Sequence, residues 1–328
     1  MADVAVVGAG VNGLATAWAL RRAGHDAVVY EQFELGHARG SSHGRTRIFR
    51  HAYAESNWVR LSIEALDGWR ELERESGEEL LVLNGLLELY RKGVVSSEAA
   101  LEECGVECET LTAEETRDRF GVAPDDDALV LFQPDAGTVH AERAMRAFAR
   151  DLRIVEGRRV ESLDDVDEPV VVVTAGPWAR RLLAPAGIEL PVVETRETIV
   201  YFKLAGEIPS VVAEVVTRGH GFYSLADPVH GLKVGSHMRG SPSDPDEVCG
   251  PDDEIVQEIV DWTRARFARV DPDPVEAETC FYTSTDDERF ILERHGRIVV
   301  GSACSGHGFK FAPATGRRLA ALAVEALA

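Results

Sequence analysis

Residues 2–31 read ADVAVVGAGVNGLATAWALRRAGHDAVVYE, and this stretch decides the fold. Residues 2–7 are apolar apart from Asp3, which is typical of a short buried strand. A helical stretch then runs to Gly24, and a second apolar run, residues 27–30, ends at Glu31. The order is strand, Gly-x-Gly-x-x-Gly turn, helix, strand and acid, which indicates a dinucleotide-binding βαβ unit.

The residue types of this unit match what a dinucleotide requires. Gly8 makes the tight turn, Gly10 lets a pyrophosphate approach the backbone, and Gly13 allows the helix to pack closely on the strand. The helix N-terminus offers partial positive charge to the phosphates, and Glu31 can accept hydrogen bonds from a ribose. The motif does not separate FAD from NAD, but Glu31 argues against the 2′-phosphate of NADP.

Length and composition narrow the class of protein. The 328 residues are enough for about two domains. Acidic residues outnumber basic ones by 56 to 35, and the resulting net charge of -21 makes nucleic-acid and membrane-surface partners unexpected. The five cysteines form no CxxC pair, which argues against a disulfide scaffold and against a zinc or other metal site. With no signal peptide and no apolar run of about 18 residues, we expect a cytoplasmic protein.

The rest of the chain alternates between helical and extended patterns. We expect helices at residues 57–76, 140–152, 252–267 and 315–327, and strands at residues 86–90, 129–132, 170–173, 198–203, 221–225, 231–235 and 297–300. An acidic segment, residues 102–127, separates two of these strands. The pattern predicts two interleaved domains with ligands in the cleft between them.

Three separated segments carry residues suited to chemistry. Residues 40–50, GSSHGRTRIFR, place three arginines and a histidine on a loop, which is either a solvated basic loop or a local anion site. On a strand at 231–237, Lys233 and His237 share one face, which could also be an exposed edge. The third segment, residues 280–313, ends in a glycine-rich turn before a helix N-terminus, where an anionic oxygen could be stabilised. Lysine is rare in this chain, so we give weight to each one that is retained.

These segments resemble the monomeric sarcosine oxidase family, amine oxidases among the D-amino-acid-oxidase-like flavoproteins. Residues 40–50 are similar to its Gly-Ser-x-His-Gly-x-Thr-Arg-x-x-Arg loop, and residues 280–290 to its Cys-x-Tyr-Thr-x-Thr-x-Asp-x-x-Phe segment. Residues 305–310 match Ser-Gly-His-Gly-Phe-Lys, and residues 233–237 match Lys-x-Gly-x-His. Several motifs in the same order are far more specific than any one of them.

The resemblance implies a role for individual residues. Cys280 takes the position at which the family attaches FAD through a thioether, although a buried structural thiol is the other reading. Lys233 resembles the lysine at the site of oxygen reduction, and Arg47 and His43 resemble residues packed against the flavin, so these three form the implied catalytic set. The implied substrate-binding residues are Arg50 and Lys310, which would hold a carboxylate, with His237, Tyr223 and His307. The implied cofactor-binding residues are Gly8, Gly10, Gly13, Glu31, Ser42, Thr46, Gly176, Trp178, Cys280, Gly306, Gly308, Phe309 and Lys310.

The resemblance also implies the fold and the reaction. We expect an α/β chain, α+β overall, in which a Rossmann-like FAD-binding domain is interleaved with a mixed or antiparallel β-sheet substrate domain. The FAD-binding domain would comprise residues 1–83, 138–190 and 287–328, and the substrate domain residues 84–137 and 191–286. The expected reaction is oxidation of the C–N bond of a secondary amine or amino acid to an imine, by hydride-equivalent transfer to flavin N5.

Reoxidation by O2 would then give hydrogen peroxide. We expect the protein to be a monomer.

Two alternatives stay open. One is a dehydrogenase of the same fold that passes electrons to a quinone or carrier. The other is a non-catalytic nucleotide-binding protein, which would not need Arg50, Lys233 and Lys310 to converge.

Overall fold

A computed structural model of the chain describes residues 2–206, 211–217 and 220–328. It contains a six-stranded sheet whose inner strands are almost wholly apolar, as expected for strands covered on both faces. Its strands in order are β17 (Ile291–His295), β18 (Ile298–Ser302), β10 (Val170–Val173), β1 (Val4–Val7), β2 (Ala27–Tyr30) and β9 (Arg153–Val155). All neighbours run parallel except β17, which is antiparallel to β18.

Helices cover both faces of this parallel sheet. The side chains of each strand alternate between the two faces, so each face carries its own hydrophobic core. Val170 and Val172 pack into one core and Val171 and Val173 into the other. The first core includes side chains of α1 (Val11–Arg22), α2 (Ser56–Ser76), α5 (Ala141–Ala149) and α8 (Ala312–Leu327). The second includes side chains of α6 (Ala179–Leu183) and of the 3-10 turn η1 (Leu163–Asp165); two further 3-10 turns, η2 (Gly176–Trp178) and η3 (Ala184–Ala186), flank α6.

A larger, mostly antiparallel sheet forms the second layer system. Its order is β15 (Ser241–Pro242), β11 (Val193–Leu204), β14 (Gly231–His237), β13 (His220–Asp227), β12 (Val211–Thr217), β5 (Leu86–Tyr90), β7 (Leu129–Gln133) and β6 (Glu109–Leu111), and β16 (Val270–Ser284) also pairs with β11. One face packs on α7 (Asp253–Arg266), with Trp262 stacked on Phe222. The pair of β5 and β12 is parallel and joins segments far apart in sequence.

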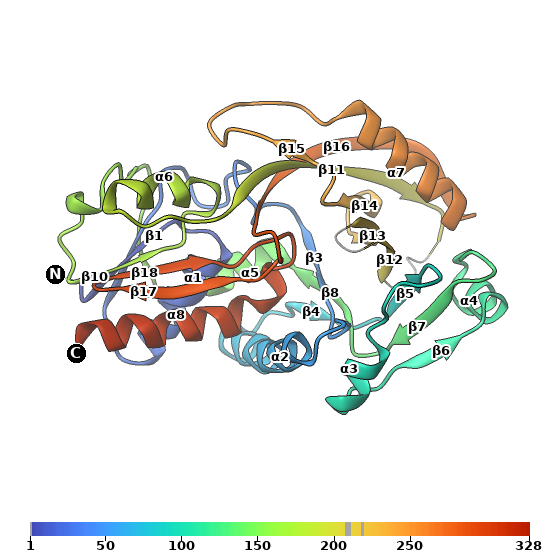
Figure 1. Cartoon of the computed structure of the whole chain (residues 1–328), viewed down its shortest axis with the longest axis horizontal. Coiled ribbons are helices and arrows are strands. Elements are labelled where there is room, and N and C mark those ends of the chain that lie inside the picture. The colour runs from blue at the N-terminus through green and yellow to red at the C-terminus, as the bar shows by residue number, and fades with distance from the viewer. Residues whose placement is uncertain (1, 207–210, 218–219) are drawn as a thin grey trace.

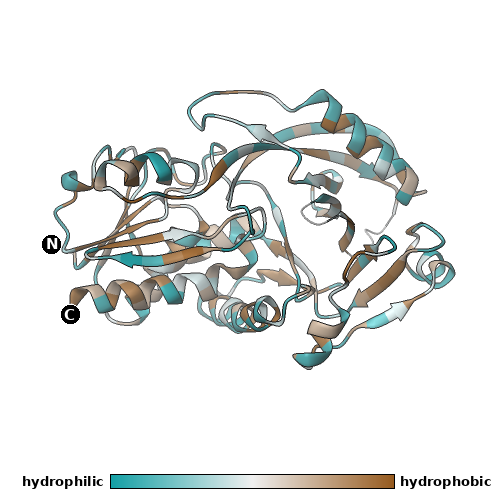
Figure 2. Cartoon of the chain, in the orientation of Figure 1, coloured by the Kyte–Doolittle hydropathy of each residue, from teal (hydrophilic) through white to brown (hydrophobic). Residues whose placement is uncertain are grey.

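A small sheet of β3 (Thr46–Phe49), β8 (Gly137–His140) and β4 (Leu81–Val82) connects the two larger ones. Figure 1 shows the parallel sheet with both termini at one end and the large sheet with α7 at the other. The long strands β11 and β16 extend from one end toward the other. Two short helices, α3 (Glu98–Glu103) and α4 (Ala113–Phe120), lie beside β6 and β7. In Figure 2 the inner strands of the parallel sheet are brown, whereas α7 turns many hydrophilic residues outward.

The predicted α/β fold class is confirmed, and most predicted elements are present. Three expectations need correction. The stretch at residues 40–50 is not all loop, since residues 46–49 form β3. Strand β14 is not an edge, because β11 and β13 flank it. The helix expected at residues 140–152 ends at Ala149.

Some elements had no counterpart in the prediction. The acidic segment at residues 102–127 contains β6 and α4, and α4 begins with a capping box between Thr112 and Glu115. Strand β16 is the longest in the described chain, yet it begins VDPDPVE, a sequence that does not suggest a strand. None of the helices in the described ranges combines the length and apolar character that crossing a membrane requires.

Candidate active site

A cavity of about 950 Å³ is lined by residues of the parallel sheet, the large sheet and β3. Among the predicted catalytic and substrate-binding residues, those lining it are His43, Arg47, Arg50, Tyr223, Lys233, His237, His307 and Lys310. Among the predicted cofactor residues, those lining it are Gly8, Gly10, Glu31, Ser42, Thr46, Gly176, Trp178, Cys280, Gly306, Gly308 and Phe309. Gly13 does not line the cavity. A Cβ on Gly13 would lie 1.9 Å from the Gly8 carbonyl oxygen, so the glycine allows α1 to pack closely on the turn, as expected.

The glycine-rich turn and Glu31 build one end of the cavity. Gly8 has a φ of 102°, in the region that favours glycine, and it begins the turn between β1 and α1. The Glu31 side chain is buried and accepts the N–H of Ala9 at 2.8 Å and of Phe33 at 3.0 Å. Burial opposes ionisation of Glu31, but bonds from His37, Ala9 and Phe33 hold its pKa below the usual value. The acid is therefore ionised and fixed beside the turn.

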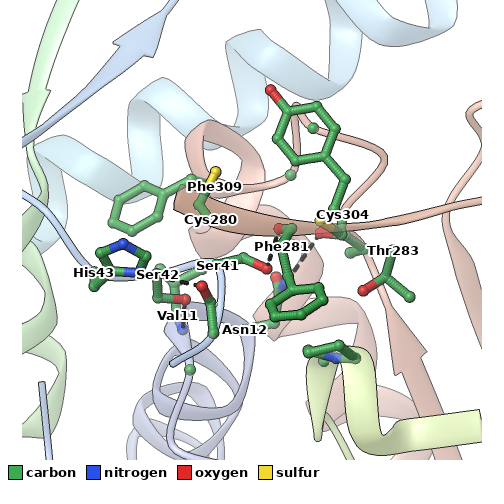
Figure 3. A pocket seen from close by; sticks show the side chains of 18 of the residues that line it. Val11, Asn12, Ser41, Ser42, His43, Cys280, Phe281, Thr283, Cys304 and Phe309 are labelled. Carbon is green, nitrogen blue, oxygen red and sulfur yellow. Dashed lines mark hydrogen bonds between the residues drawn. The ribbon is translucent and has the colours of Figure 1, made fainter. Parts of the chain in front are cut away.

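The cavity offers donors and acceptors that fit a flavin dinucleotide. Within the part of the chain that the structure describes, the hydroxyls of Thr46 and Thr283 are buried without a partner although both residues line the cavity. Such groups need a partner when buried, and a polar ligand can provide one. Val11 at the start of α1 donates its N–H to Ser42 Oγ at 3.0 Å, which ties the loop of residues 40–45 to the turn (Figure 3).

Lys233 and Arg47 form a first cationic cluster. Lys233 Nζ is buried and donates to the Thr46 carbonyl at 3.3 Å. Burial, followed by the charge of Arg47, lowers the pKa of Lys233 to about 7. The same two causes lower the pKa of His43 to about 4, so this imidazole is neutral. Arg47 donates to the carbonyls of Ser41 at 2.8 Å and of His43, and its guanidinium lies over the Phe309 ring at 5.5 Å.

Arg50 and Lys310 form a second cationic cluster around Tyr53. The Arg50 guanidinium lies 4.9 Å from the centre of the Tyr53 ring, and Lys310 Nζ donates to the Tyr53 hydroxyl at 3.0 Å. Lys310 also donates to the His307 carbonyl at 2.9 Å, while its own carbonyl accepts the indole N–H of Trp69 at 2.8 Å. Burial and the nearby Arg50 charge hold the pKa of Lys310 well below its usual value. The three cations expected to converge thus share a cavity but belong to two clusters.

Cys280 lies on β16 and faces the cavity near Phe309 (Figure 3). Its thiol is buried, and burial raises the pKa to about 12, against the opposing effect of Arg47 and Lys233. The hydroxyl of Ser41 donates to the carbonyl of the next residue, Phe281, at 2.5 Å, so the loop of residues 40–45 is fastened to β16 beside this thiol.

Tyr223, His237 and His307, the remaining predicted substrate-binding residues, also line the cavity. Tyr223 lies opposite Gly235 in the sheet, where a Cβ would be 2.4 Å from the Tyr223 ring, so only glycine leaves room for this ring. His237 Nε2 is 3.9 Å from a Glu288 carboxylate oxygen. His307 contacts the Tyr53 hydroxyl at 3.2 Å, and burial, followed by the charge of Lys310, holds its pKa well below the usual value.

Several residues at the site were missed in the sequence. Tyr53, Tyr282 and Glu288 line the cavity, and Glu88 contacts Arg50 at 3.2 Å from behind. The sequence does carry a signal for Glu88, because it is the only charged residue in the run of residues 86–90. The other four residues of that run are three leucines and Tyr90. The aromatic residues had none, since an aromatic side chain in a sequence is more often part of the core.

Comparisons with known proteins agree with this geometry. Residues 3–322 match the family of FAD dependent oxidoreductases. The chain is similar to the peroxisomal sarcosine oxidase of Homo sapiens, 32% identical with 98% of this chain and 92% of that protein covered. It is 29% identical to the monomeric sarcosine oxidase of a Bacillus species, with the same shares covered.

Solved structures give the same result. NikD, an unusual amino acid oxidase essential for nikkomycin biosynthesis, has a TM-score of 0.87 and 29% identity, with 99% of this chain and 94% of that chain covered. The glycine oxidase of Geobacillus kaustophilus, at 21% identity and a TM-score of 0.81, covers 99% of this chain and 95% of its own and shares the fold.

Proposed function

This chain belongs to the FAD-dependent oxidoreductases and is a relative of the sarcosine oxidases. We propose that it oxidises the C–N bond of a small amine or amino acid that bears a carboxylate. The observation that carries this proposal is the contact of both Arg50 and Lys310 with Tyr53, in the same cavity as the glycine-rich turn. A nucleotide end and an anion-binding end in one cavity are what such a reaction requires.

Arg50 and Lys310 would bind the substrate carboxylate. A guanidinium offers two parallel N–H donors to a carboxylate, and an ammonium adds a third. The anion would raise the pKa of Lys310, because an opposite charge favours the protonated form. Two cations at this end also disfavour a further positive charge on the substrate, so its amine is held neutral and ready for oxidation.

The cofactor supplies the redox chemistry. When bound, FAD accepts the hydride equivalent at N5 and is later reoxidised. Arg47, His43, Thr46 and Phe309 would surround its ring, while Gly8, Gly10 and Glu31 would bind the dinucleotide portion. We propose that Cys280 holds it covalently through a thioether.

We propose O2 as the electron acceptor, with hydrogen peroxide as product. Lys233 would stabilise the negative charge that develops on oxygen, because a buried ammonium stabilises an anion strongly. The chain would act as a monomer, as the names of several relatives suggest. A cytoplasmic location stays a prediction from the sequence.

A panel of N-methyl, cyclic and primary amino acids, scored by peroxide formation, tests the proposed reaction. We expect peroxide with at least one carboxylate-bearing amine and none with the matching amine that lacks the carboxylate. Substrate-dependent bleaching of the flavin without peroxide would instead identify a dehydrogenase. A flavoprotein that no amine reduces would refute the proposed function.

Lys233→Met tests the role in oxygen reduction. We expect it to slow reoxidation by O2 far more than anaerobic reduction by substrate. Lys203→Met is the matched control, since Lys203 is an exposed lysine on the neighbouring strand β11. Equal slowing of both half-reactions would contradict the assignment.

Acid precipitation tests the covalent link. With Cys280 attached, the yellow colour stays with the precipitated chain, and in Cys280→Ser it moves to the supernatant. Colour in the supernatant of the wild type would remove Cys280 as the attachment point.

A further inference from the structure

Glu88 is a carboxylate in the interior of the large sheet. It is the central residue of β5, whose five residues are all buried, and its own exposure is 2%. A charged carboxylate at such a place requires partners that replace water. Its partners therefore tell what the residue does.

The two oxygens of Glu88 have separate partners. Oε1 accepts from Arg50 Nη1 at 3.2 Å, and Oε2 accepts from the Tyr90 hydroxyl at 2.5 Å and from Ser97 Oγ at 2.7 Å. The Ser97 backbone N–H in turn donates to the Tyr90 hydroxyl at 3.1 Å. The carboxylate is thus fixed on one side by two hydroxyls and presents its other oxygen to Arg50.

Arg50 lies between Glu88 and the cavity. Arg50 is one of the cavity-lining residues, whereas Glu88 is not among those that line it in the described part of the chain. The central carbon of the guanidinium lies over the Tyr53 ring, and its Nη1 donates to Glu88. A ring contact and a hydrogen bond to one nitrogen together limit how the guanidinium can turn.

We propose that Glu88 is a positioning residue that orients Arg50 for the carboxylate of the substrate. This inference rests on the proposed function, and it adds a requirement for the geometry of the anion site. Because a bidentate bond to a carboxylate needs two parallel N–H groups, its strength depends on how the guanidinium is turned. Glu88 also balances the charge of the half-buried Arg50 when no anion is bound.

Acetate binding to the flavin-containing protein tests this role, and the change in flavin absorbance measures that binding. Acetamide, a neutral ligand of the same shape, is the second probe. In Glu88→Ala we expect acetate to bind about tenfold more weakly or worse, the effect of losing one fixed charge-assisted bond. Acetamide binding should change by less than about twofold, because it makes no charge-assisted pair with Arg50.

Two further variants keep the test decisive. Glu88→Gln retains an oxygen for Arg50 Nη1, so we expect it to restore acetate affinity to within about threefold of wild type. Tyr90→Phe removes one donor that fixes Glu88, and about threefold weaker acetate binding is expected. If Glu88→Ala does not yield folded flavoprotein, Tyr90→Phe decides, and an unchanged affinity in it overturns the proposal.

Glu194→Gln is the matched control. Glu194 is a buried carboxylate of the same sheet and pairs with Arg180 through two bonds of 3.0 and 2.8 Å, outside the cavity lining of the described residues. We expect acetate affinity to be unchanged in this variant. Equal or tighter acetate binding in Glu88→Ala overturns the proposal, as does a wild type that shows no acetate response. A wild type that binds acetate but oxidises no amine refutes only the proposed function.

Discussion

Lys233 shows how its surroundings change the chemistry of a single residue. Its ammonium is buried in β14, where β3 and β16 contribute Arg47, Glu278 and Cys280 to its electrostatic environment and β13 contributes Asp227. Burial and Arg47 lower the pKa of Lys233 to about 7, whereas the acidic groups oppose this shift. The lysine therefore changes its charge within the physiological range.

This pKa predicts how reoxidation depends on pH. Below about 7 Lys233 is protonated and can stabilise negative charge on oxygen, and as pH rises through 7 that charge is lost. We expect the rate constant for reaction of the reduced protein with O2 to fall between pH 6 and 8.5, measured by stopped-flow absorbance. Lys203→Met should keep this profile and Lys233→Met should lose it. A rate constant that rises with pH would contradict the assignment.

The motifs of the sequence located the cationic residues of both clusters. Arg47, Arg50, Lys233 and Lys310 were all named in advance, and all four line it. The division into two clusters was not predictable, because it depends on Tyr53, which contacts both Arg50 and Lys310 and has no motif of its own. The charge of Glu88 stands out in its apolar strand, but its pairing with Arg50 is seen only when β5 is placed beside the arginine.

At the scale of elements, helices α1 and α8 are in close contact. A Cβ on Gly316 would lie 2.6 Å from the backbone carbon of Ala15, so the glycine permits this approach. The Thr315 hydroxyl donates to the Asn12 side chain at 2.9 Å and fastens α8 to the start of α1. Because Lys310 lies in the 3-10 turn η4 (Phe309–Phe311) that leads into α8, the packing of these helices also places part of the anion site.

Gly316→Ala tests this packing. Glycine to alanine within a helix is usually stabilising, but here the methyl group must push two backbones apart, and we expect a loss of about 1–3 kcal/mol. The midpoint of urea unfolding measures it. Ala321→Leu, an addition on the exposed side of α8, is the control and should change the free energy of unfolding by less than about 0.5 kcal/mol. A Gly316→Ala variant as stable as wild type would show that the helices can separate freely.

The predicted elements were those whose pattern is local. Residues 170–173 and 86–90 were predicted with their observed bounds, because short apolar runs identify buried strands. Strand β16 was missed because Pro272 and Pro274 remove backbone donors and its first half is largely exposed. Strand β16 is held by its pairing with β11. Because β11 lies far away in the sequence, a local pattern cannot predict this pairing.

At the scale of the whole molecule, the excess of acidic residues over basic ones sets the long-range electrostatics. Even if each of the 35 basic residues were paired, 21 of the 56 acidic residues would remain without a cation. Many of the ion pairs lie at the surface, such as Arg60 with Glu103, and pairs of this kind contribute little. Repulsion among the remaining carboxylates therefore opposes the compact state.

Salt should stabilise this protein at low ionic strength. Raising NaCl from about 10 to 150 mM shortens the screening length from about 30 to 8 Å, which weakens that repulsion. We expect the Tm, measured by calorimetry, to rise with salt, by roughly 2–4 °C for each kcal/mol gained in the free energy of unfolding. Glycerol at equal osmolality, which does not screen charge, is the control. A Tm that falls with salt would mean that the surface ion pairs outweigh the repulsion.

The parallel pairing of β5 with β12 has a consequence for synthesis. Leu86 pairs with Val211, so 125 further positions must be translated before β5 gains this neighbour. At roughly 5–20 residues per second, its hydrogen-bonding edge stays open for about 6–25 s on the ribosome. An inward-facing charge on such an edge discourages nascent chains from adding to one another. We expect Glu88 to have this effect while β5 waits for β12.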